Sequence, residues 1–276
     1  MTDDERQPGA IGDSTEPDSA VTTAGGEGGA EADSSAKPSK TRGRRQLPIW
    51  QESVLLVVVA LVLAILVKSL FVQAFYIPSA SMEPGLVNSD RILVEKPSYW
   101  LGGSPSRGDV IVFEDPGGWL GAGEGDQVSG FRSALSKIGL YPSGGHLVKR
   151  VIGVAGDTIV CCDAEGRISV NGKALDEDNY IAPRRENIQC NGPMISQCDW
   201  TAGPVPEGTV FVMGDNRANS ADSTVHLCLK GETDCTDNPF VDTDLVVGKV
   251  FVVLWPRSHF RFVATPDSFA DIPDPG

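Results

Sequence analysis

Two serines near residue 80 lie in a segment stiff enough to hold a nucleophile. Residues 77–86 read IPSASMEPGL, so Ser79 and Ser81 stand between two prolines. Proline fixes the backbone angle φ and leaves its neighbours few conformations. Serines in Pro-rich turns are usually turn residues only, and a serine hydroxyl needs a base before it can attack a carbonyl. The segment therefore predicts chemistry only if the chain also supplies that base.

Lys149 is the candidate base. Residues 147–154 read LVKRVIGV, which predicts a strand with Leu147, Lys149 and Val151 on one face. A free lysine has a pKa of about 10.4 and is charged at neutral pH, but burial disfavours the ammonium and lowers the pKa. We expect a buried, neutral Lys149 to act with Ser81 as a Ser/Lys dyad, a known variant of serine-protease chemistry. The alternative is a lysine whose charged end reaches solvent from a sheet edge.

A third segment, residues 214–223, is densely polar and reads GDNRANSADS. It follows a β-type run at residues 209–213, so we expect a turn at the end of a strand. Taken alone, its acidic and hydroxyl side chains suit either a capped loop or a calcium-type cluster of oxygen ligands.

The elements that must position these residues are strands. From residue 75 onward, short β-type runs alternate with Gly, Pro, Asn and Asp, and no long helical period is present. Strands are predicted at residues 91–95, 110–113, 147–154, 158–160, 168–170, 209–213 and 246–255. Asn171-Gly172 predicts a hairpin turn after one of them. Residues 115–145 form a Gly-rich insertion that lacks the lysine and the strand-to-helix context of a phosphate loop, so we expect a mobile surface loop.

The N-terminal part of the chain predicts a disordered tail and a membrane anchor. Residues 1–46 are polar and lack aromatic side chains, which is typical of disorder. Basic residues between Lys37 and Arg45 precede an apolar run over residues 49–67, long enough to cross a hydrocarbon core of about 30 Å. We expect a retained single-pass anchor over residues 47–70 rather than a cleaved secretory signal. The basic flank predicts a cytoplasmic N-terminus in the cell membrane and an extracytoplasmic remainder.

All six cysteines fall in the predicted extracytoplasmic part, where disulfides form. We expect Cys228 to pair with Cys235 across a short polar loop. The adjacent Cys161 and Cys162 are expected to reach Cys190 and Cys198 rather than each other, because neighbouring residues rarely meet disulfide geometry. A zinc site is the alternative, but no close C-x-x-C pair is present.

Four segments together carry a resemblance to a known family. Residues 78–86, 107–113, 149–157 and 214–223 resemble, in order, the conserved boxes of the bacterial type I (leader) signal peptidases, the S26 serine protease family. The similarity runs from about residue 68 to 255 and leaves out the insertion and the cysteine-bearing loops. It implies a mainly β chain, with an all-β catalytic domain of the signal-peptidase/repressor-autoprotease type over residues 71–265 and a C-terminal tail over 266–276.

The resemblance also implies roles for individual residues. Ser81 matches the nucleophile, Lys149 the general base, and Ser79 the serine whose hydroxyl completes an oxyanion hole with the Ser81 amide. Ser220 matches the serine that orients the base. The polar residues that would hold the site together are Asp215, Arg217 and Asp222.

Two positions depart from the family pattern. Thr224 stands where many members have an arginine that partners the aspartate matched by Asp222, and Gly85 replaces a usual threonine. Both changes bear on local hydrogen bonding, and neither removes the Ser81/Lys149 pair.

The activity implied by the resemblance is that of a membrane-bound serine endopeptidase that removes N-terminal signal peptides. Its substrates would be exported preproteins cut after small-x-small sites, typically Ala-x-Ala. The expected partners are these preproteins, the lipid bilayer and the protein translocation machinery, with no cofactor and no metal. Nucleic acid is not expected as a partner, because the formal net charge is −14.

Three other functions compete with this one. A repressor-type Ser/Lys autoprotease shares the β core but is soluble and carries a DNA-binding domain. A non-catalytic envelope protein could bind peptides on the same scaffold. A Ser-His-Asp hydrolase using His226 and Asp222 is the third, but the sequence has no Gly-x-Ser-x-Gly elbow.

Overall fold

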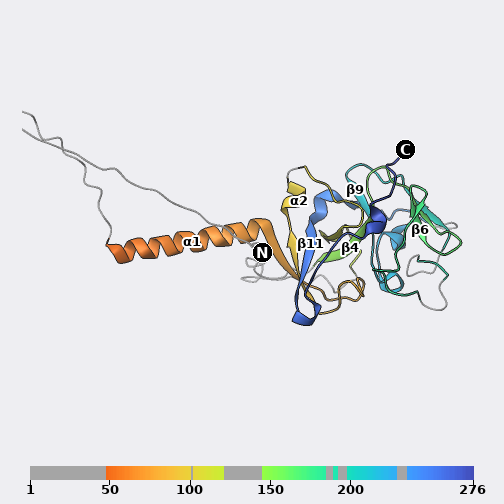
Figure 1. Ribbon diagram of the computed structural model, residues 1–276. Helices are drawn as coiled ribbons and strands as arrows, with labels where there is room; N and C mark the ends of the chain where they lie inside the picture. The colour runs from red at the N-terminus through yellow and green to blue at the C-terminus, as the bar shows by residue number, and fades with distance from the viewer. Residues whose placement is uncertain (1–47, 101, 121–144, 185–188, 192–197, 229–234) are drawn as a thin grey trace, which may run out of the picture. The chain divides into compact units, whose positions relative to one another are not determined.

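The computed structural model describes residues 48–276 apart from 101, 121–144, 185–188, 192–197 and 229–234. The predicted tail over residues 1–46 and most of the predicted insertion over 115–145 lie outside this part of the chain. The described residues form one long helix, two antiparallel sheets and several short helices (Figure 1). The prediction of a mainly β protein behind one apolar helix is confirmed.

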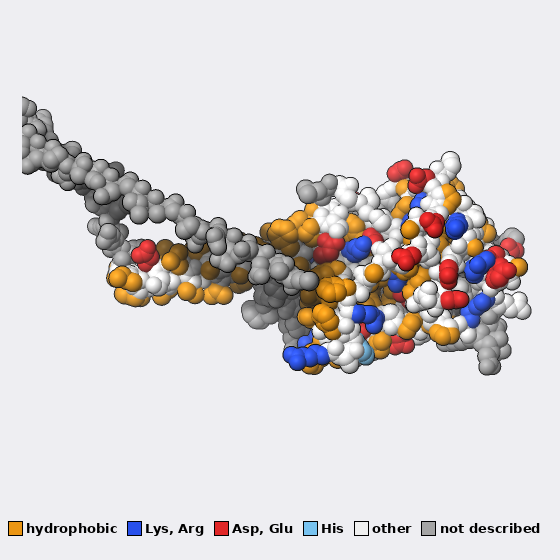
Figure 2. Space-filling view, viewed as in Figure 1, with side chains coloured by type: hydrophobic (Ala, Val, Ile, Leu, Met, Phe, Trp, Pro, Cys, Tyr) orange, Lys and Arg blue, Asp and Glu red, His pale blue; other side chains and the backbone are white. Residues whose placement is uncertain are grey.

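The long helix, α1 (Ile49–Phe71), is apolar on every side over residues 54–67. Residues Ile49–Val67 are long and apolar enough to cross a membrane, and none of that stretch is buried in the protein (Figure 2). A helix without a polar face finds no stable place on a soluble surface, which favours contact with lipid. The helix leads without a break into β1 (Val72–Tyr76), and the Lys96 amide donates a hydrogen bond of 3.1 Å to the carbonyl of Phe71.

The larger sheet carries the candidate site. Within the described ranges it consists of eight strands in the order β1-β2-β11-β3-β4-β9-β10, with β12 beside β11. Besides β1, its strands are β2 (Arg91–Glu95), β3 (Val110–Glu114), β4 (His146–Gly153), β9 (Thr209–Met213), β10 (Val241–Asp242), β11 (Val246–Trp255) and β12 (Arg261–Phe262).

Alternating side chains on the central strands give this sheet two apolar faces. On β3, Val112 packs into one hydrophobic cluster, whereas Ile111 and Phe113 pack into another. On β4, Leu147 and Val151 join the cluster of Ile111. Lys149 lies between Leu147 and Val151 on β4. It therefore has a neighbouring strand on each side and an apolar side chain before and after it on the same strand.

The smaller sheet, in the order β7-β6-β5-β8, lies at the other end of the β domain (Figure 1). Its strands are β5 (Ile159–Cys161), β6 (Ile168–Val170), β7 (Lys173–Ala174) and β8 (Trp200–Ala202). The predicted turn at Asn171-Gly172 is confirmed, since Val170 pairs with Lys173 across it.

The chain after residue 265 packs into the core next to this smaller sheet. The sequence assigned residues 266–276 to a C-terminal tail. In the structure, Phe269 of the short helix η5 (Asp267–Phe269) and Ile272 are buried together with Ile159 and Trp200. The segment therefore completes a hydrophobic cluster of the β domain.

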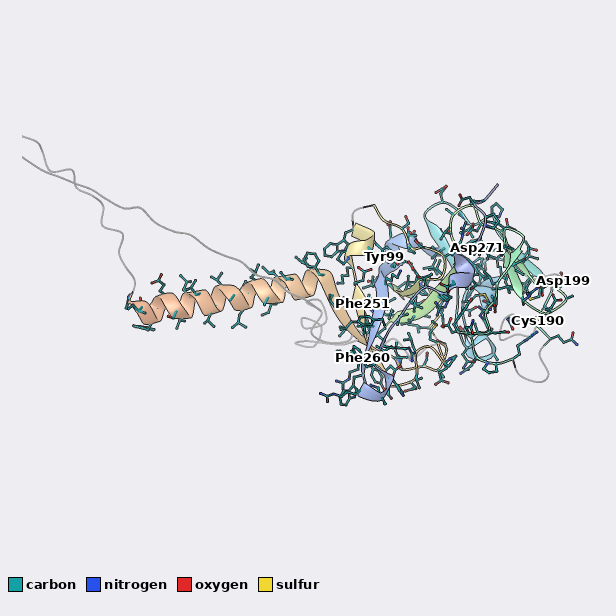
Figure 3. All side chains as sticks on the ribbon, viewed as in Figure 1. Tyr99, Cys190, Asp199, Phe251, Phe260 and Asp271 are labelled. Carbon is teal, nitrogen blue, oxygen red and sulfur yellow. A yellow bond between two sulfur atoms is a disulfide. The ribbon has the colours of Figure 1, made fainter. Side chains whose placement is uncertain are left out.

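The six cysteines form three disulfides, Cys161–Cys162, Cys190–Cys198 and Cys228–Cys235. The pairing of Cys228 with Cys235 is confirmed. The prediction that Cys161 and Cys162 reach Cys190 and Cys198 is wrong, because the two neighbours bond to each other. The sulfur atoms of Cys161, Cys162 and Cys190 nevertheless lie within 4.8 Å of one another, beside the smaller sheet (Figure 3). The sequence thus predicted that Cys161 and Cys162 lie near Cys190, but it did not predict their disulfide partners.

Candidate active site

The segment that carries Ser79 and Ser81 is held by buried apolar side chains and by backbone hydrogen bonds. Met82 and Leu86 are almost fully buried in the first apolar cluster, and the Leu86 amide donates to the Met82 carbonyl at 2.8 Å. The Ser81 carbonyl accepts a hydrogen bond of 2.9 Å from the backbone amide of Asn216. The Ser81 side chain is 9% exposed, and its Oγ lies 3.1 Å from Oγ of Ser79, which is exposed. The candidate nucleophile is therefore held by its backbone while its hydroxyl faces a second hydroxyl at the surface.

Lys149 lies on β4, one of the interior strands of the larger sheet. It pairs with Ile111 across β3, and only 4% of its surface is exposed. The expectation of a buried lysine is thus confirmed, and the alternative of a sheet-edge lysine is wrong. Burial lowers the pKa of Lys149 below the ordinary lysine value, while the carboxylates of Asp222 and Asp215 act in the opposite direction.

Gly214 is the point at which the three segments converge. A Cβ atom at this position would lie 2.5 Å from the Ser81 carbonyl oxygen and 2.3 Å from Ser220 Oγ, so a glycine is required for their close approach. Arg150 pairs with Met213 and Val151 with Val212, so Lys149 directly precedes the first paired residue of β4 and Gly214 directly follows its partner on β9. Ser81 and Ser220 are consequently neighbours of one glycine, although they are far apart in the sequence.

Asp222 organises the turn that follows Gly214. One carboxylate oxygen accepts from Ser220 Oγ at 2.7 Å and from the Gly214 amide at 2.9 Å. The other accepts from the amide and the hydroxyl of Thr224, at 3.1 and 2.6 Å. Asp222 is the N-cap of the short helix η2 (Ser223–His226), and all three partners are buried with it. Thr224, the residue that departs from the family pattern, therefore supplies two neutral donors to Asp222.

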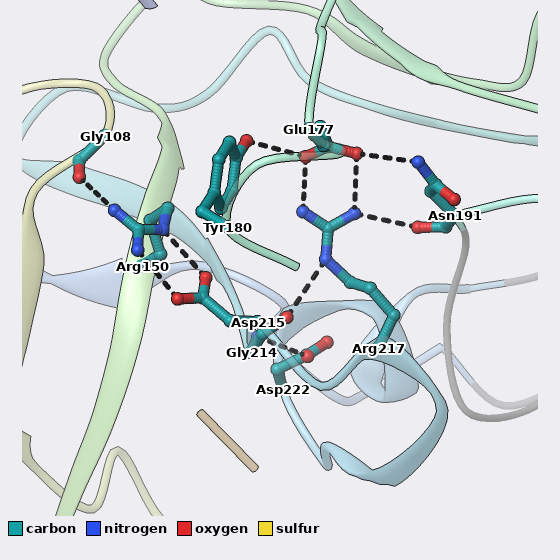
Figure 4. A network of polar contacts seen from close by, with 9 residues as sticks. All are labelled: Gly108, Arg150, Glu177, Tyr180, Asn191, Gly214, Asp215, Arg217 and Asp222. Carbon is teal, nitrogen blue, oxygen red and sulfur yellow. Dashed lines mark hydrogen bonds and ion pairs between the residues drawn. The ribbon is translucent and has the colours of Figure 1, made fainter. Parts of the chain in front are cut away.

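Two buried ion pairs lie on the other side of the turn (Figure 4). Arg150 donates to both carboxylate oxygens of Asp215 at 2.7 Å and to the Gly108 carbonyl at 2.8 Å. Arg217, in the short helix η1 (Arg217–Asn219), pairs in the same two-pronged manner with Glu177. Such pairs have the geometry of the strongest charge-assisted hydrogen bonds.

Several residues of the polar network in Figure 4 were not singled out by sequence reasoning. They are Arg150, Glu177, Tyr180 and Asn191. Arg150 could have been found, because it alternates with Lys149 on the same predicted strand and a cation on the opposite face of a buried strand needs a partner. Nothing in the sequence marks the other three, which lie between β7 and β8.

His226 has surroundings that do not suit a Ser-His-Asp triad. Its ring stacks on Trp119 at a centroid distance of 4.5 Å, and its Nδ1 lies 3.4 Å from the exposed Asp237. The four hydrogen bonds to Asp222 come from Ser220, Gly214 and Thr224 instead. The structure thus places His226 against Trp119, away from the hydrogen bonds of the Asp222 carboxylate.

In the part of the chain that the structure describes, one group of three side chains has the spacing to hold a metal ion, namely Cys161, Cys162 and Cys190. All three sulfur atoms are engaged in disulfides, so none is available as a thiolate ligand in this state. The group also lies beside the smaller sheet, apart from Lys149 and Ser81.

The β domain follows an apolar helix and contains a buried lysine, two serine hydroxyls in contact with each other, and a turn held by two ion pairs. These are the features of a membrane-associated peptidase. The family described as "Signal peptidase, peptidase S26" matches residues 50–255. Signal peptidase I of Mycobacterium tuberculosis is 38% identical over 253 residues, which cover 85% of this chain and 83% of the relative. Signal peptidase I of Leptolyngbya laminosa is 30% identical, over 85% of this chain and 93% of the relative. The chain belongs to the signal peptidase S26 family, and it is a signal-peptide-removing peptidase.

Proposed function

We propose that this protein is a serine endopeptidase that uses Ser81 as nucleophile and Lys149 as general base to cut exported preproteins after Ala-x-Ala-type sites. The observation that carries the proposal is the convergence at Gly214. The carbonyl of Ser81 and the hydroxyl of Ser220 both lie at this residue, and Lys149 directly precedes Arg150, whose partner Met213 directly precedes Gly214. Lys149 is buried enough for its neutral form to be accessible.

The reaction follows from this arrangement. Neutral Lys149 takes the proton of Ser81 as Oγ attacks the scissile carbonyl, and the amide of Ser81 together with the hydroxyl of Ser79 binds the oxyanion. Lys149 then returns the proton to the leaving amine, which leaves an acyl-enzyme on Ser81. Hydrolysis of that ester by a water molecule that Lys149 deprotonates restores the free enzyme.

The supporting residues fix the two reacting groups relative to each other. Asn216 holds the backbone on both sides of the nucleophile, because its amide donates to the Ser81 carbonyl and its side chain donates to the Ala80 carbonyl at 3.0 Å. Asp222 holds Ser220 beside Gly214. Positioning of this kind is where a substantial part of enzymatic rate enhancement originates.

Lipid contact is the second part of the proposal. Besides α1, large hydrophobic side chains are exposed on α2 (Pro97–Trp100), at the end of β11 and beyond it, namely Trp100, Leu254, Trp255, Phe260 and Phe262. Phe71 at the end of α1 contacts Trp100 with a ring distance of 5.6 Å. Figure 2 shows hydrophobic side chains along α1 and on the adjoining part of the β domain. The bilayer would therefore contact this edge of the domain as well as α1, with the N-terminus in the cytoplasm, the β domain outside, and the translocation machinery nearby.

The test is cleavage of a preprotein whose signal ends in Ala-x-Ala by the detergent-solubilised full chain. Wild type and a Ser104→Ala control, which changes an exposed serine without a described hydrogen bond, should release the mature chain. Ser81→Ala should not, while keeping the circular dichroism spectrum and melting temperature of wild type. N-terminal sequencing of the product identifies the bond that is cut. Equal cleavage by Ser81→Ala would refute the nucleophile, and binding of the signal without cleavage by any variant would favour the peptide-binding alternative.

A further inference from the structure

Glu177 is a buried acid that the Ser81/Lys149 reaction does not use. It lies after β7, 1% exposed, and its carboxylate receives four described hydrogen bonds. Two come from Arg217, one from the hydroxyl of Tyr180 at 2.9 Å, and one from the side-chain amide of Asn191 at 3.4 Å. A carboxylate without these donors would be costly to bury, so the pocket around Glu177 is built for its charged form.

The partner of Glu177 lies in the turn that holds the nucleophile. Besides the ion pair, Arg217 donates from Nε to the Gly214 carbonyl at 3.0 Å and from Nη1 to the Asn191 carbonyl at 2.8 Å. The next residue back in the chain is Asn216, whose amide binds the Ser81 carbonyl. A displacement of Arg217 therefore moves the residue that holds Ser81 and the glycine that Ser81 and Ser220 contact.

Tyr180 links this ion pair to the second one (Figure 4). Its hydroxyl binds Glu177, and the guanidinium carbon of Arg150 lies 4.6 Å from the centre of its ring. Arg150 in turn pairs with Asp215, the residue after Gly214. The turn is thus attached at Asp215 and at Arg217 to one connected network, which links β4 to the chain between β7 and β8.

We propose that Glu177 is a positioning residue of the active site, which fixes Arg217 and, through it, the turn at residues 214–222. The inference rests on the proposed Ser81/Lys149 function and adds a residue outside the four segments that carry the family resemblance. It distinguishes this ion pair from one that only stabilises the fold, because it requires Glu177 to affect the reaction in molecules that remain folded.

The network also defines the charge around the base. The carboxylates that act on Lys149 are Asp222 and Asp215, while the cations on the far side of the turn are Arg150 and Arg217. With Glu177 neutral, the buried guanidinium of Arg217 loses its ion-pair partner, and the carboxylate of Asp215 then offsets part of its charge. The added positive potential disfavours the ammonium form of Lys149, so the base becomes neutral at lower pH.

The experiment compares wild type, Glu177→Gln and Glu207→Gln in cleavage of one preprotein across a range of pH. Glu207 is an exposed acid that precedes β9, at the end of the strand opposite to Gly214. Each rate is divided by the concentration of folded protein, measured by near-ultraviolet circular dichroism. For Glu177→Gln we expect kcat to fall about 10- to 100-fold with little change in KM, and the acidic limb of kcat/KM to move to lower pH. Glu177→Asp, which keeps the charge, should restore the position of that limb. Glu207→Gln should match wild type.

If Glu177→Gln fails to fold, Tyr180→Phe serves instead, since it removes one donor to Glu177 and keeps the ring under Arg150. We expect this variant to lose about three- to tenfold in kcat, as for the loss of one hydrogen bond to a charged group. Wild-type kcat per folded molecule and an unmoved acidic limb in either variant would overturn the inference alone. An inactive wild type would overturn the proposed function and this inference together.

Discussion

Replacement of Lys149 by methionine is expected to abolish cleavage and at the same time to stabilise the protein at neutral pH. The side chain is 4% exposed and lies among Leu147, Val151 and Ile111. Methionine is also unbranched and one heavy atom shorter, so it fills most of the space without strain. The variant loses the base but also loses a group whose charged form the native state disfavours.

The sign of the effect follows from the direction of the pKa shift. Burial lowers the pKa of Lys149 in the folded protein, whereas the unfolded chain has a value of about 10.4. Between these two values the unfolded chain binds a proton that the folded chain does not, so wild-type stability falls as the pH decreases from about 10.4 toward the folded pKa. Methionine carries no such proton. The advantage of Lys149→Met should therefore be small near pH 10 and increase as the pH is lowered.

We expect a gain in the free energy of unfolding on the order of 1–3 kcal/mol at pH 7, as for other buried ionisable groups replaced by apolar side chains. For a domain of this size, that corresponds to a rise in melting temperature of about 2–10 °C. The assay is thermal and denaturant unfolding of the full chain in detergent at several pH values, beside preprotein cleavage. Lys173→Met, at an exposed position of β7, is the matched control and should show no pH-dependent gain. A Lys149→Met protein less stable than wild type at pH 7, or a difference independent of pH, would refute the reasoning.

Three further changes test other parts of the site. Asp222→Asn removes a charge that favours the ammonium form of Lys149, so the acidic limb of the pH–rate profile should move to lower pH. It also removes an acceptor for a buried amide, which should lower the free energy of unfolding by about 1–3 kcal/mol. An acidic limb that moves to higher pH would contradict the assignment. Ser79→Ala should lower kcat about 10²- to 10³-fold, as for the loss of one oxyanion donor. The melting temperature should not change, because the exposed Ser79 hydroxyl contacts only Ser81 among the described contacts. Retention of full kcat would exclude Ser79 from the oxyanion hole. Gly214→Ala should abolish cleavage and lower the free energy of unfolding by about 1–3 kcal/mol, since the Cβ of the alanine would overlap the Ser81 carbonyl and Ser220. A crystal structure of the variant with both groups unmoved would contradict the packing argument.

The strands were predictable from the sequence where local pattern and tertiary environment agree. The predicted ranges 91–95, 168–170, 209–213 and 246–255 coincide with β2, β6, β9 and β11, because β-branched residues there are bounded by turn residues. β1 was not predicted. Its residues continue the apolar run of α1 without a turn signal, and only their pairing with β2 makes them a strand. The two-residue strands β7, β10 and β12 are too short to have a sequence pattern.

The candidate site was predictable to the extent that its chemistry is local. Lys149 on an apolar strand face and Ser81 between prolines are visible in the sequence. The structure buries Lys149 and holds the Ser81 carbonyl close to Gly214. Glu177 is not visible, because an acid in a polar loop becomes significant only when the fold places it against Arg217. The partners of Cys161 and Cys162 were likewise undetermined, since four cysteines within one neighbourhood allow several pairings.

The position of β11 bears on when the enzyme becomes active during its synthesis. β11 is the last long strand in the chain, yet it lies between β2 and β3 and pairs with both. Until residue 255 is available, β2 and β3 have no shared partner, and the strands that carry Lys149 cannot close onto those beside Ser81. Contacts of such long sequence separation form late in folding. A nascent chain would therefore carry its anchor and both reacting residues well before it has a working site, and unfinished copies would not cleave neighbouring proteins.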